Sequence, residues 1–319
     1  MITDVHGIHH VTAYAGDAQK NVDFYAGILG LRLVKKTVNF DDPHTYHLYY
    51  GDEGGTPGSI MTFFPRTFQG RRGRPGTGQV TAIHFSIPEK AMAYWIDRLK
   101  QYRIDFEGPL SRFDEEEVVT LSDPDGLALG LVSSASDTRP GCDNESIPAS
   151  NAIRGFHSVG ISVEDIVLTA GLMTETLGFR RGQESGNRFR YQAGEGGPGT
   201  IVDLLCQPNA PSGQMGVGAV HHVAWRVVDR AAQLQLRQEL IQLGYDVTPV
   251  MDRVYFHSIY FVEPGRVLFE VATDSPGFAV DEALEDLGTH LMLPSCLEQK
   301  RATIEQVLPL IGEPDPKGL

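Results

Sequence analysis

A short apolar strand that carries a histidine recurs four times in the 319-residue chain. Two copies hold a histidine pair, in Gly7-Ile8-His9-His10-Val11-Thr12 and Gly218-Ala219-Val220-His221-His222-Val223. The other two copies hold one histidine each, His84 and His157. When the second member of each pair is counted, the histidines fall about 65 to 75 residues apart. This period predicts four copies of one structural unit.

Each unit has the same order of elements. An amphipathic run follows the histidine strand, and in three units it begins at an aspartate and ends at Leu-Gly, as helices often do: Asp17 to Gly30, Asp165 to Gly178 and Asp229 to Gly244. The second unit, Glu89 to Tyr102, lacks the final glycine. Runs of alternating polarity follow, and a Pro/Gly turn precedes the last apolar strand. The sequence therefore predicts an α+β fold of four βαβββ modules.

The last strand of the fourth module contains a carboxylate. Glu270 interrupts the apolar run from Val267 to Ala272, where an acidic side chain is costly unless it is paired or binds a cation. We therefore regard Glu270 as the strongest single candidate for a functional residue.

Histidines on the first strands of the modules are the natural partners of this glutamate. Neighbouring residues on a strand face opposite sides, so one histidine of each pair is expected to serve the site. Alignment with the lone histidines selects His10 and His222. Two imidazoles and one carboxylate are the ligands of the facial triad that binds non-haem Fe(II). The alternative is that these histidines only satisfy hydrogen bonds in a core.

A second set of such residues lies in the middle modules. His84 and His157 supply imidazoles, and the repeat alignment places Asp203 in the register of Glu270. The second module, however, has Gly130 at that register. We interpret this set as a structural relic.

Four βαβββ modules with a histidine on the first strand resemble the vicinal oxygen chelate superfamily, which includes glyoxalase I, extradiol ring-cleaving dioxygenases and bleomycin resistance proteins. The resemblance implies paired modules whose sheets curl around a metal. We expect an N-terminal domain over residues 1–133 with modules 1 and 2, and a linker over 134–151. A C-terminal domain over 152–275 with modules 3 and 4 and a tail with helical runs over 276–319 complete the prediction.

A narrower resemblance covers nearly the whole chain. Several segments are similar to the hydroquinone-cleaving branch of the ring-cleaving dioxygenases: Gly7 to Thr12, Gly16 to Gln19, Val34 to Val38, Tyr46 to Tyr50, Gly155 to Ser158 and the His221-His222 pair. This resemblance implies metal ligands at His10, His222 and Glu270, the trio that the repeat also selects. It further implies catalytic roles around the metal for four residues: Thr12, His221, Arg253 and Tyr260.

These four residues have distinct expected positions. Thr12 shares a strand face with His10 by the period of two. His221 points away from His222 on a regular strand, so a bulge is needed to bring it to the substrate, where it is suited to proton transfer. Arg253 and Tyr260 fall on a predicted hairpin before the last strand, and they are suited to stabilising developing negative charge.

The implied cofactor is Fe(II), and Mn(II) suits the same ligands. The implied partners are a small aromatic diol and O₂. A formal charge of −14 argues against nucleic acid and anionic membranes as partners. The three scattered cysteines and the absence of a signal peptide or long apolar run indicate the cytoplasm. The sequence leaves open whether the chain forms a homo-oligomer, and which ring substituents its substrate carries.

Three classes of function remain open at this point. The first is a Fe(II) dioxygenase that cleaves para-diols by inserting both atoms of O₂, which we favour. The second is a metal-dependent isomerase or lyase of the glyoxalase kind, which would use four ligands, often with two carboxylates. The third is a metal-free binding protein of the bleomycin-resistance kind, for which the trio would be accidental.

Overall fold

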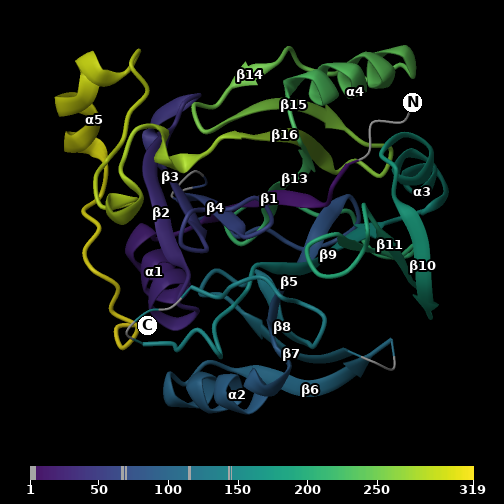
Figure 1. The fold of residues 1–319 in the computed structure, drawn as a ribbon, viewed down its shortest axis with the longest axis horizontal. Coiled ribbons are helices and arrows are strands. Elements are labelled where there is room, and N and C mark those ends of the chain that lie inside the picture. Colours follow the sequence, from purple (N-terminus) through teal and green to yellow (C-terminus); the bar gives the residue numbers. More distant parts are fainter. Residues whose placement is uncertain (1–4, 66–67, 69, 114–115, 143, 145) are drawn as a thin grey trace.

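A computed structural model describes residues 5–65, 68, 70–113, 116–142, 144 and 146–319. It confirms four βαβββ modules (Figure 1). The first contains β1 (Ile8–Ala15), α1 (Ala18–Val22), β2 (Arg32–Asn39), β3 (Asp42–Gly51) and β4 (Ile60–Pro65). The second contains β5 (Gln79–Pro88), α2 (Met92–Gln101), β6 (Phe106–Arg112), β7 (Glu116–Ser122) and β8 (Ala128–Ser134).

The second half of the chain repeats this order. The third module contains β9 (Phe156–Val163), α3 (Val167–Gly171), β10 (Arg180–Ser185), β11 (Arg188–Gln192) and β12 (Ile201–Cys206). The fourth contains β13 (Val220–Val227), α4 (Arg230–Gln242), β14 (Met251–Asp252), β15 (Phe256–Val262) and β16 (Leu268–Pro276). The tail forms short turns and α5 (Arg301–Val307).

The helices begin and end largely where the sequence predicts. The side chain of Asp17 accepts a hydrogen bond from the backbone of Lys20 and so caps α1. After α2, which has no terminal glycine, Arg103 takes the left-handed conformation with φ of 57°. Two helices differ from the prediction because α1 and α3 continue into wider π-helical turns, with bonds such as that from Leu29 N to Phe24 O of 2.9 Å.

The strands form two eight-stranded sheets. Their orders are β14-β15-β16-β13-β1-β4-β3-β2 and β10-β11-β12-β9-β5-β8-β7-β6. The first sheet combines the first and fourth modules, and the second combines the two middle modules. Each sheet therefore contains strands from before and after the segment 134–151. The predicted boundaries of the N-terminal domain, the linker and the C-terminal domain stay a prediction. The described part of that segment holds an isolated bridge between Asn144 and Ile147, while residues 143 and 145 lie outside the described residues.

An antiparallel strand pair with two bulges forms the centre of each sheet. In the first sheet, His10 lies opposite Ala224 and Thr12 lies opposite His222. The register shifts on either side make His9 the extra residue of β1 and His221 the extra residue of β13. The bulge that His221 needs in order to turn toward the site is therefore present.

The second sheet has the same bulges, and they correct the alignment of the lone histidines. Ser158 lies opposite His84, as His10 lies opposite Ala224, so Ser158 holds the position of His10. The histidine just before it, His157, is the extra residue of its strand and is the counterpart of the other bulge histidine of β1. The sequence-based alignment of His84 and His157 with the proposed ligands was wrong, because it matched histidine with histidine, whereas the strand pairing matches His157 with His9 and His84 with Ala224.

The other positions of the trio are also replaced in the second sheet. Ala82 holds the position of His222, and Gly130 holds that of Glu270. When the third module is instead superimposed on the fourth, Asp203 lies opposite Gly160 as Glu270 lies opposite Ala224, so the predicted register of Asp203 with Glu270 is confirmed.

The tail packs on the first module. The ammonium of Lys35, fully buried, lies 2.6 Å from Asp281 and 2.5 Å from Glu282. The hydroxyl of Tyr46 donates to the carbonyl of Pro309 at 3.0 Å. The tail, which the sequence predicts only as helical runs, is thus tied to β2 and β3 by the ion pairs of a buried lysine and by backbone contacts.

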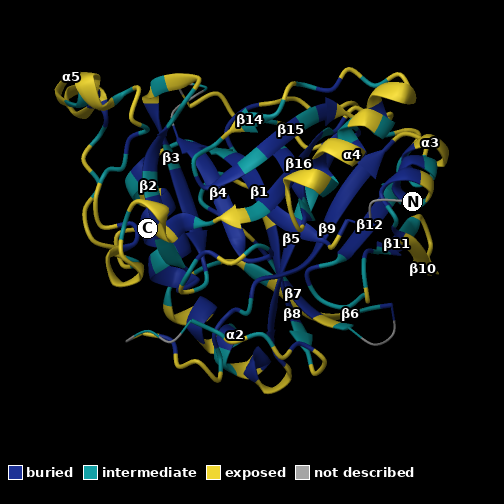
Figure 2. Ribbon diagram, turned by 45° about the horizontal axis from the view of Figure 1, so that its top comes forward, coloured by how far each residue is buried: buried dark blue, intermediate teal, exposed yellow. Residues whose placement is uncertain are grey.

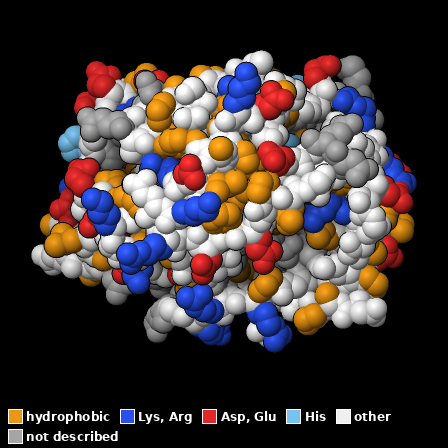
Figure 3. Space-filling view, turned by 90° about the horizontal axis from the view of Figure 1, so that it is seen from below, with side chains coloured by type: hydrophobic (Ala, Val, Ile, Leu, Met, Phe, Trp, Pro, Cys, Tyr) orange, Lys and Arg blue, Asp and Glu red, His pale blue; other side chains and the backbone are white. Residues whose placement is uncertain are grey.

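Burial follows the sheets. The strands at the centre of both sheets are buried, while α4 and α5 have exposed outer faces (Figure 2). On the face seen from below, acidic and basic side chains are interspersed around a small hydrophobic patch (Figure 3). No helix among the described residues is long and apolar enough to cross a bilayer.

Candidate metal centre

The two histidines and the glutamate selected from the sequence meet at the centre of the first sheet. The Nε2 atoms of His10 and His222 lie 3.2 Å apart. The Oε2 atom of Glu270 lies 3.3 Å from the first and 2.8 Å from the second. Each residue comes from a different strand, β1, β13 and β16, and all three are buried. Their ligand atoms form the one group of this kind found among the described residues.

The spacing of these atoms fits a bound cation. Cis ligands about 2.1 Å from a metal ion lie about 3.0 Å apart, close to the three separations observed. Although Oε2 of Glu270 approaches both imidazoles, it has no partner with hydrogen-bond geometry. A buried carboxylate oxygen without such a partner is costly, and a cation at the point where the three atoms converge would satisfy it.

The protonation of the trio also favours metal binding. Burial raises the pKa of Glu270, but the neighbouring imidazoles outweigh this effect and hold the pKa well below its usual range. Burial lowers the pKa of His222, which leaves its ring neutral with a free lone pair. The hydroxyl of Ser258 donates to Oε1 of Glu270 and fixes the carboxylate on the side away from the imidazoles.

Each proposed ligand histidine is hydrogen-bonded to the bulge histidine before it. The Nδ1 atoms of His9 and His10 lie 2.9 Å apart, and those of His221 and His222 lie 2.8 Å apart. Burial, together with the adjacent histidine, lowers the pKa of both His9 and His221 to about 3. Both rings are therefore neutral near pH 7, and each bulge histidine orients its neighbour.

Tyr260 and Arg253 lie beside the trio. Tyr260 is directly opposite Glu270 on β15, and its ring centre lies 5.7 Å from that of His222. Burial, followed by the charge of Glu270, raises the pKa of Tyr260, so that it remains a phenol donor. The guanidinium of Arg253 lies 5.5 Å from the centre of the Tyr260 ring and 3.3 Å from Asp41.

Thr12 forms its side-chain hydrogen bond with Thr62. Its hydroxyl contacts that of Thr62 at 2.8 Å, and Thr62 contacts Nε2 of His47 at 2.9 Å. The hydroxyl of Tyr49 lies 2.8 Å from Nδ1 of His47, and this completes a hydrogen-bonded row from Thr12 to Tyr49. Sequence reasoning did not assign roles to His47 and Tyr49. Their spacing of two residues on one strand face was the signal that could have found them.

A cavity of about 370 Å³ opens beside these groups. Its volume lies near the lower end of the roughly 300–1,000 Å³ typical of ligand sites, which suits a single aromatic ring. The lining residues are His10, Tyr14, Asn39, Phe40, Asp41, His47, Tyr49, Phe64, His221, His222, Met251, Arg253, Phe256, Tyr260 and Leu268.

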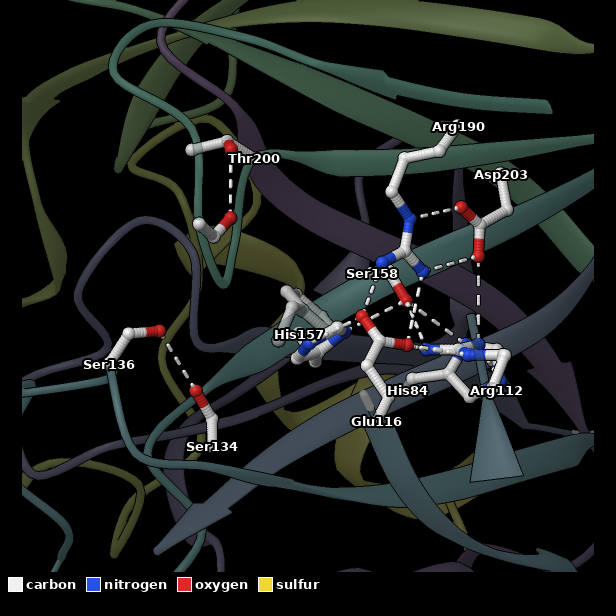
Figure 4. A network of polar contacts seen from close by, with 12 residues as sticks. His84, Arg112, Glu116, Ser134, Ser136, His157, Ser158, Arg190, Thr200 and Asp203 are labelled. Atoms are coloured by element: carbon white, nitrogen blue, oxygen red, sulfur yellow. Dashed lines mark hydrogen bonds and ion pairs between the residues drawn. The ribbon is translucent and has the colours of Figure 1, made fainter. Parts of the chain in front are cut away.

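In the second sheet, charged side chains fill the corresponding place (Figure 4). Arg190 donates to Asp203 at 2.8 and 3.0 Å, and it also pairs with Glu116. Arg112 pairs with Glu116 at 2.7 Å and contacts Nε2 of His84 at 3.1 Å. Two guanidiniums thus supply the positive charge in the second sheet. This supports the interpretation of that set as a relic without metal.

His157 gives this network a measurable pH dependence. Burial lowers its pKa to about 4, although Glu116 opposes this. The unfolded chain, with a histidine pKa of about 6.5, binds more protons, so stability is lost as the pH falls from about 6.5 toward 4. We expect His157→Gln to lose about 2 kcal/mol less stability than the wild type between pH 7 and pH 5, measured by urea unfolding. Equal losses in both proteins would contradict the assignment.

Comparison with known proteins identifies the family of the chain. The family sequence model described as "Glyoxalase/Bleomycin resistance protein/Dioxygenase superfamily" matches residues 7–131 and 155–279. The "Putative ring-cleaving dioxygenase MhqO" of Bacillus subtilis (strain 168) is 46% identical over 302 residues, covering 95% of each chain. The "Chlorohydroquinone/hydroquinone 1,2-dioxygenase" of Sphingobium indicum is 33% identical over 300 residues, covering 92% of this chain and 93% of its own.

Two solved structures share the fold of this chain. A crystal structure described as a "putative dioxygenase from Bacillus subtilis subsp. subtilis str. 168" is 44% identical and superimposes with a TM-score of 0.93, covering 98% of this chain and 99% of its own. Glyoxalase I from Zea mays, at 16% identity and a TM-score of 0.63, covers 89% of this chain and 97% of its own, and it shares the fold alone. Because the family model spans both halves and the relatives align along nearly the whole chain, the chain belongs to the glyoxalase/bleomycin resistance protein/dioxygenase superfamily.

Proposed function

We propose that the chain is a Fe(II)-dependent, extradiol-type ring-cleaving dioxygenase that acts on hydroquinone-type para-diols and inserts both atoms of O₂. The observation that carries the proposal is the convergence of His10, His222 and Glu270 on one point beside a cavity that suits one aromatic ring. The names of relatives at 33% and 46% identity support the same class of reaction.

His10 and His222 would hold the metal through Nε2, and Glu270 would hold it through Oε2. Bound there, Fe(II) would supply binding positions for a phenolate oxygen and for O₂ and would pass electrons from the diol ring to O₂. Mn(II) suits the same ligands. The burial of the three side chains strengthens the charge interactions around the metal position.

Residues around the cavity would position the substrate and its protons. Tyr260 offers a phenol donor, and Arg253 offers a fixed positive charge for the phenolate and for charge that develops during reaction. If His222 binds metal through Nε2, its Nδ1–H donates to Nδ1 of His221. The hydrogen of the neutral His221 ring is then on Nε2, which makes His221 a hydrogen-bond donor to oxygen in the cavity.

A glyoxalase-type isomerase and a metal-free binding protein explain the arrangement of the trio less well. A glyoxalase-type isomerase would use a fourth ligand, often a second carboxylate, whereas the cluster in the described part of the chain contains one carboxylate, Glu270. A metal-free binding protein gives no reason for three buried ligand atoms to converge. The charge and spacing of the trio therefore favour the dioxygenase.

Oxygen uptake tests the proposal. Protein purified without air and reloaded with Fe(II) is expected to consume about one O₂ per molecule of hydroquinone, methylhydroquinone or chlorohydroquinone, with little response to catechol. Parallel loading with Mn(II) compares the two metals. An iron-loaded protein that consumes no O₂ with any diol would contradict the proposal and make glyoxalase-type isomerisation the next assay.

Tyr260→Phe is expected to lower kcat by about 100- to 1,000-fold, because it removes one preorganised donor while keeping the half-buried ring. Metal content is expected to stay unchanged. The matched control is Tyr245→Phe, since Tyr245 packs against Phe261 and does not line the cavity. A Tyr260→Phe enzyme with the kcat of the control would remove Tyr260 from the reaction.

A further inference from the structure

The two bulge histidines, His9 and His221, have different surroundings. His221 borders the substrate cavity. His9 is 1% exposed and packs edge-on against Phe256, with ring centres 5.0 Å apart. Its Nε2 atom lies 3.1 Å from the backbone carbonyl oxygen of Thr273 on β16. His9 thus connects a fixed backbone acceptor with His10 and has no access to solvent or substrate.

This contact determines where the protons of both rings lie. A carbonyl oxygen accepts and never donates, so the hydrogen on a neutral His9 ring is on Nε2. The Nδ1 atom of His9 then carries a lone pair. Because it lies 2.9 Å from Nδ1 of His10, the hydrogen of the His10 ring is on Nδ1. The Nε2 atom of His10 is left with a lone pair that points toward His222 and Glu270.

We propose that His9 is a positioning residue that holds His10 in its metal-binding tautomer before any metal arrives. The inference rests on the proposed metal site. In this pair, His10 is the proposed ligand and His9 holds its ring in place. A regular strand would point the two rings to opposite sides, but the bulge turns both to the same side. The sequence-based selection of one histidine per pair overlooked this role.

The second sheet provides a matched control. His157 is the bulge residue equivalent to His9, but Ser158 follows it where His10 follows His9. Its Nδ1 atom lies 3.2 Å from the hydroxyl of Ser158, and its Nε2 atom lies 3.5 Å from Glu116. The same replacement made at His157 therefore perturbs an equivalent buried ring without touching the trio.

Mn(II) binding to the metal-free full-length protein, measured by calorimetry and by Mn(II) electron paramagnetic resonance, tests the inference. His9→Phe keeps an aromatic ring but removes the acceptor, and it is expected to weaken Mn(II) binding by about 10- to 100-fold. His9→Gln can accept from His10 through its amide oxygen and donate to Thr273 through its amide nitrogen. We expect it to bind Mn(II) within about threefold of the wild type, as we expect for His157→Gln.

Each outcome decides the inference. Unchanged Mn(II) affinity in His9→Phe would overturn it while leaving the metal site in place. Equal weakening in His9→Phe and His9→Gln would also overturn it, because it would show that ring packing matters and the acceptor does not. A wild-type protein that binds no Mn(II) would instead overturn the proposed metal site itself.

The tautomer can also be read without a variant, which covers the case in which His9→Phe does not fold. In the metal-free wild type labelled with ¹⁵N-histidine, two-bond ¹H–¹⁵N correlation spectra are expected to show His10 with hydrogen on Nδ1 and His9 with hydrogen on Nε2. A His10 ring with hydrogen on Nε2 would overturn the inference.

Discussion

Replacing Glu270 with glutamine is expected to abolish ring cleavage and to lower metal affinity by more than about 100-fold, beyond the range expected for residues that only support ligands. The amide keeps the size of the side chain but removes the negative charge that balances the cation. Glu270 is fully buried, and its Oε2 atom faces both imidazoles at 2.8 and 3.3 Å. Metal content after Fe(II) loading and oxygen uptake with hydroquinone measure the two effects.

Glu263→Gln is the control for this variant. Glu263 is also a buried glutamate of the fourth module, but it accepts hydrogen bonds from Thr169 and the backbone of Val267 at the turn before β16. It should retain iron and turnover per folded molecule. If Glu270→Gln also retains both, the carboxylate is not a ligand, and the account of the metal centre is wrong.

Replacing Arg190 with methionine is expected to destabilise the chain by about 3–5 kcal/mol. The guanidinium donates two hydrogen bonds to Asp203, which is fully buried, and it also pairs with Glu116. Without it, Asp203 keeps only the longer contacts to Arg112 at 3.6 Å and Arg188 at 3.5 Å. Urea unfolding at pH 7 measures the loss.

The double variant Arg190→Met, Asp203→Leu separates charge from packing. When both partners are apolar, the uncompensated buried charge disappears, and most of the lost stability is expected to return. Oxygen uptake per folded molecule is expected to stay unchanged in both variants, because the network lies in the other sheet. A single variant as stable as the wild type would show that the ion pairs of the second sheet contribute nothing to folding.

The modules and the trio were predictable because their signals are local or periodic. Aspartate caps and glycine stops mark helix ends, as Asp17 and Asp229 do for α1 and α4. An acidic residue in an apolar strand identified Glu270, since burial makes such a residue rare without a compensating partner. The sequence also indicated that His221 requires a bulge.

What the sequence did not reveal depends on register between distant strands. Whether His157 or Ser158 holds the position of His10 depends on the pairing of β9 with β5 and on the bulges in these strands. These bulges are set by contacts between residues far apart in the chain. The same applies to His9 and to the buried pairing of Lys35 with the tail, whose partners lie more than 200 residues away.

The most direct test of the central claim is the fate of isotopically labelled oxygen. Iron-loaded enzyme is supplied with hydroquinone and ¹⁸O₂, the product is trapped with borohydride to prevent exchange of an aldehyde oxygen, and its mass is measured. A dioxygenase predicts a ring-opened product that carries two ¹⁸O atoms. A ring-intact quinone without label, with the oxygen recovered as peroxide or water, would contradict the account.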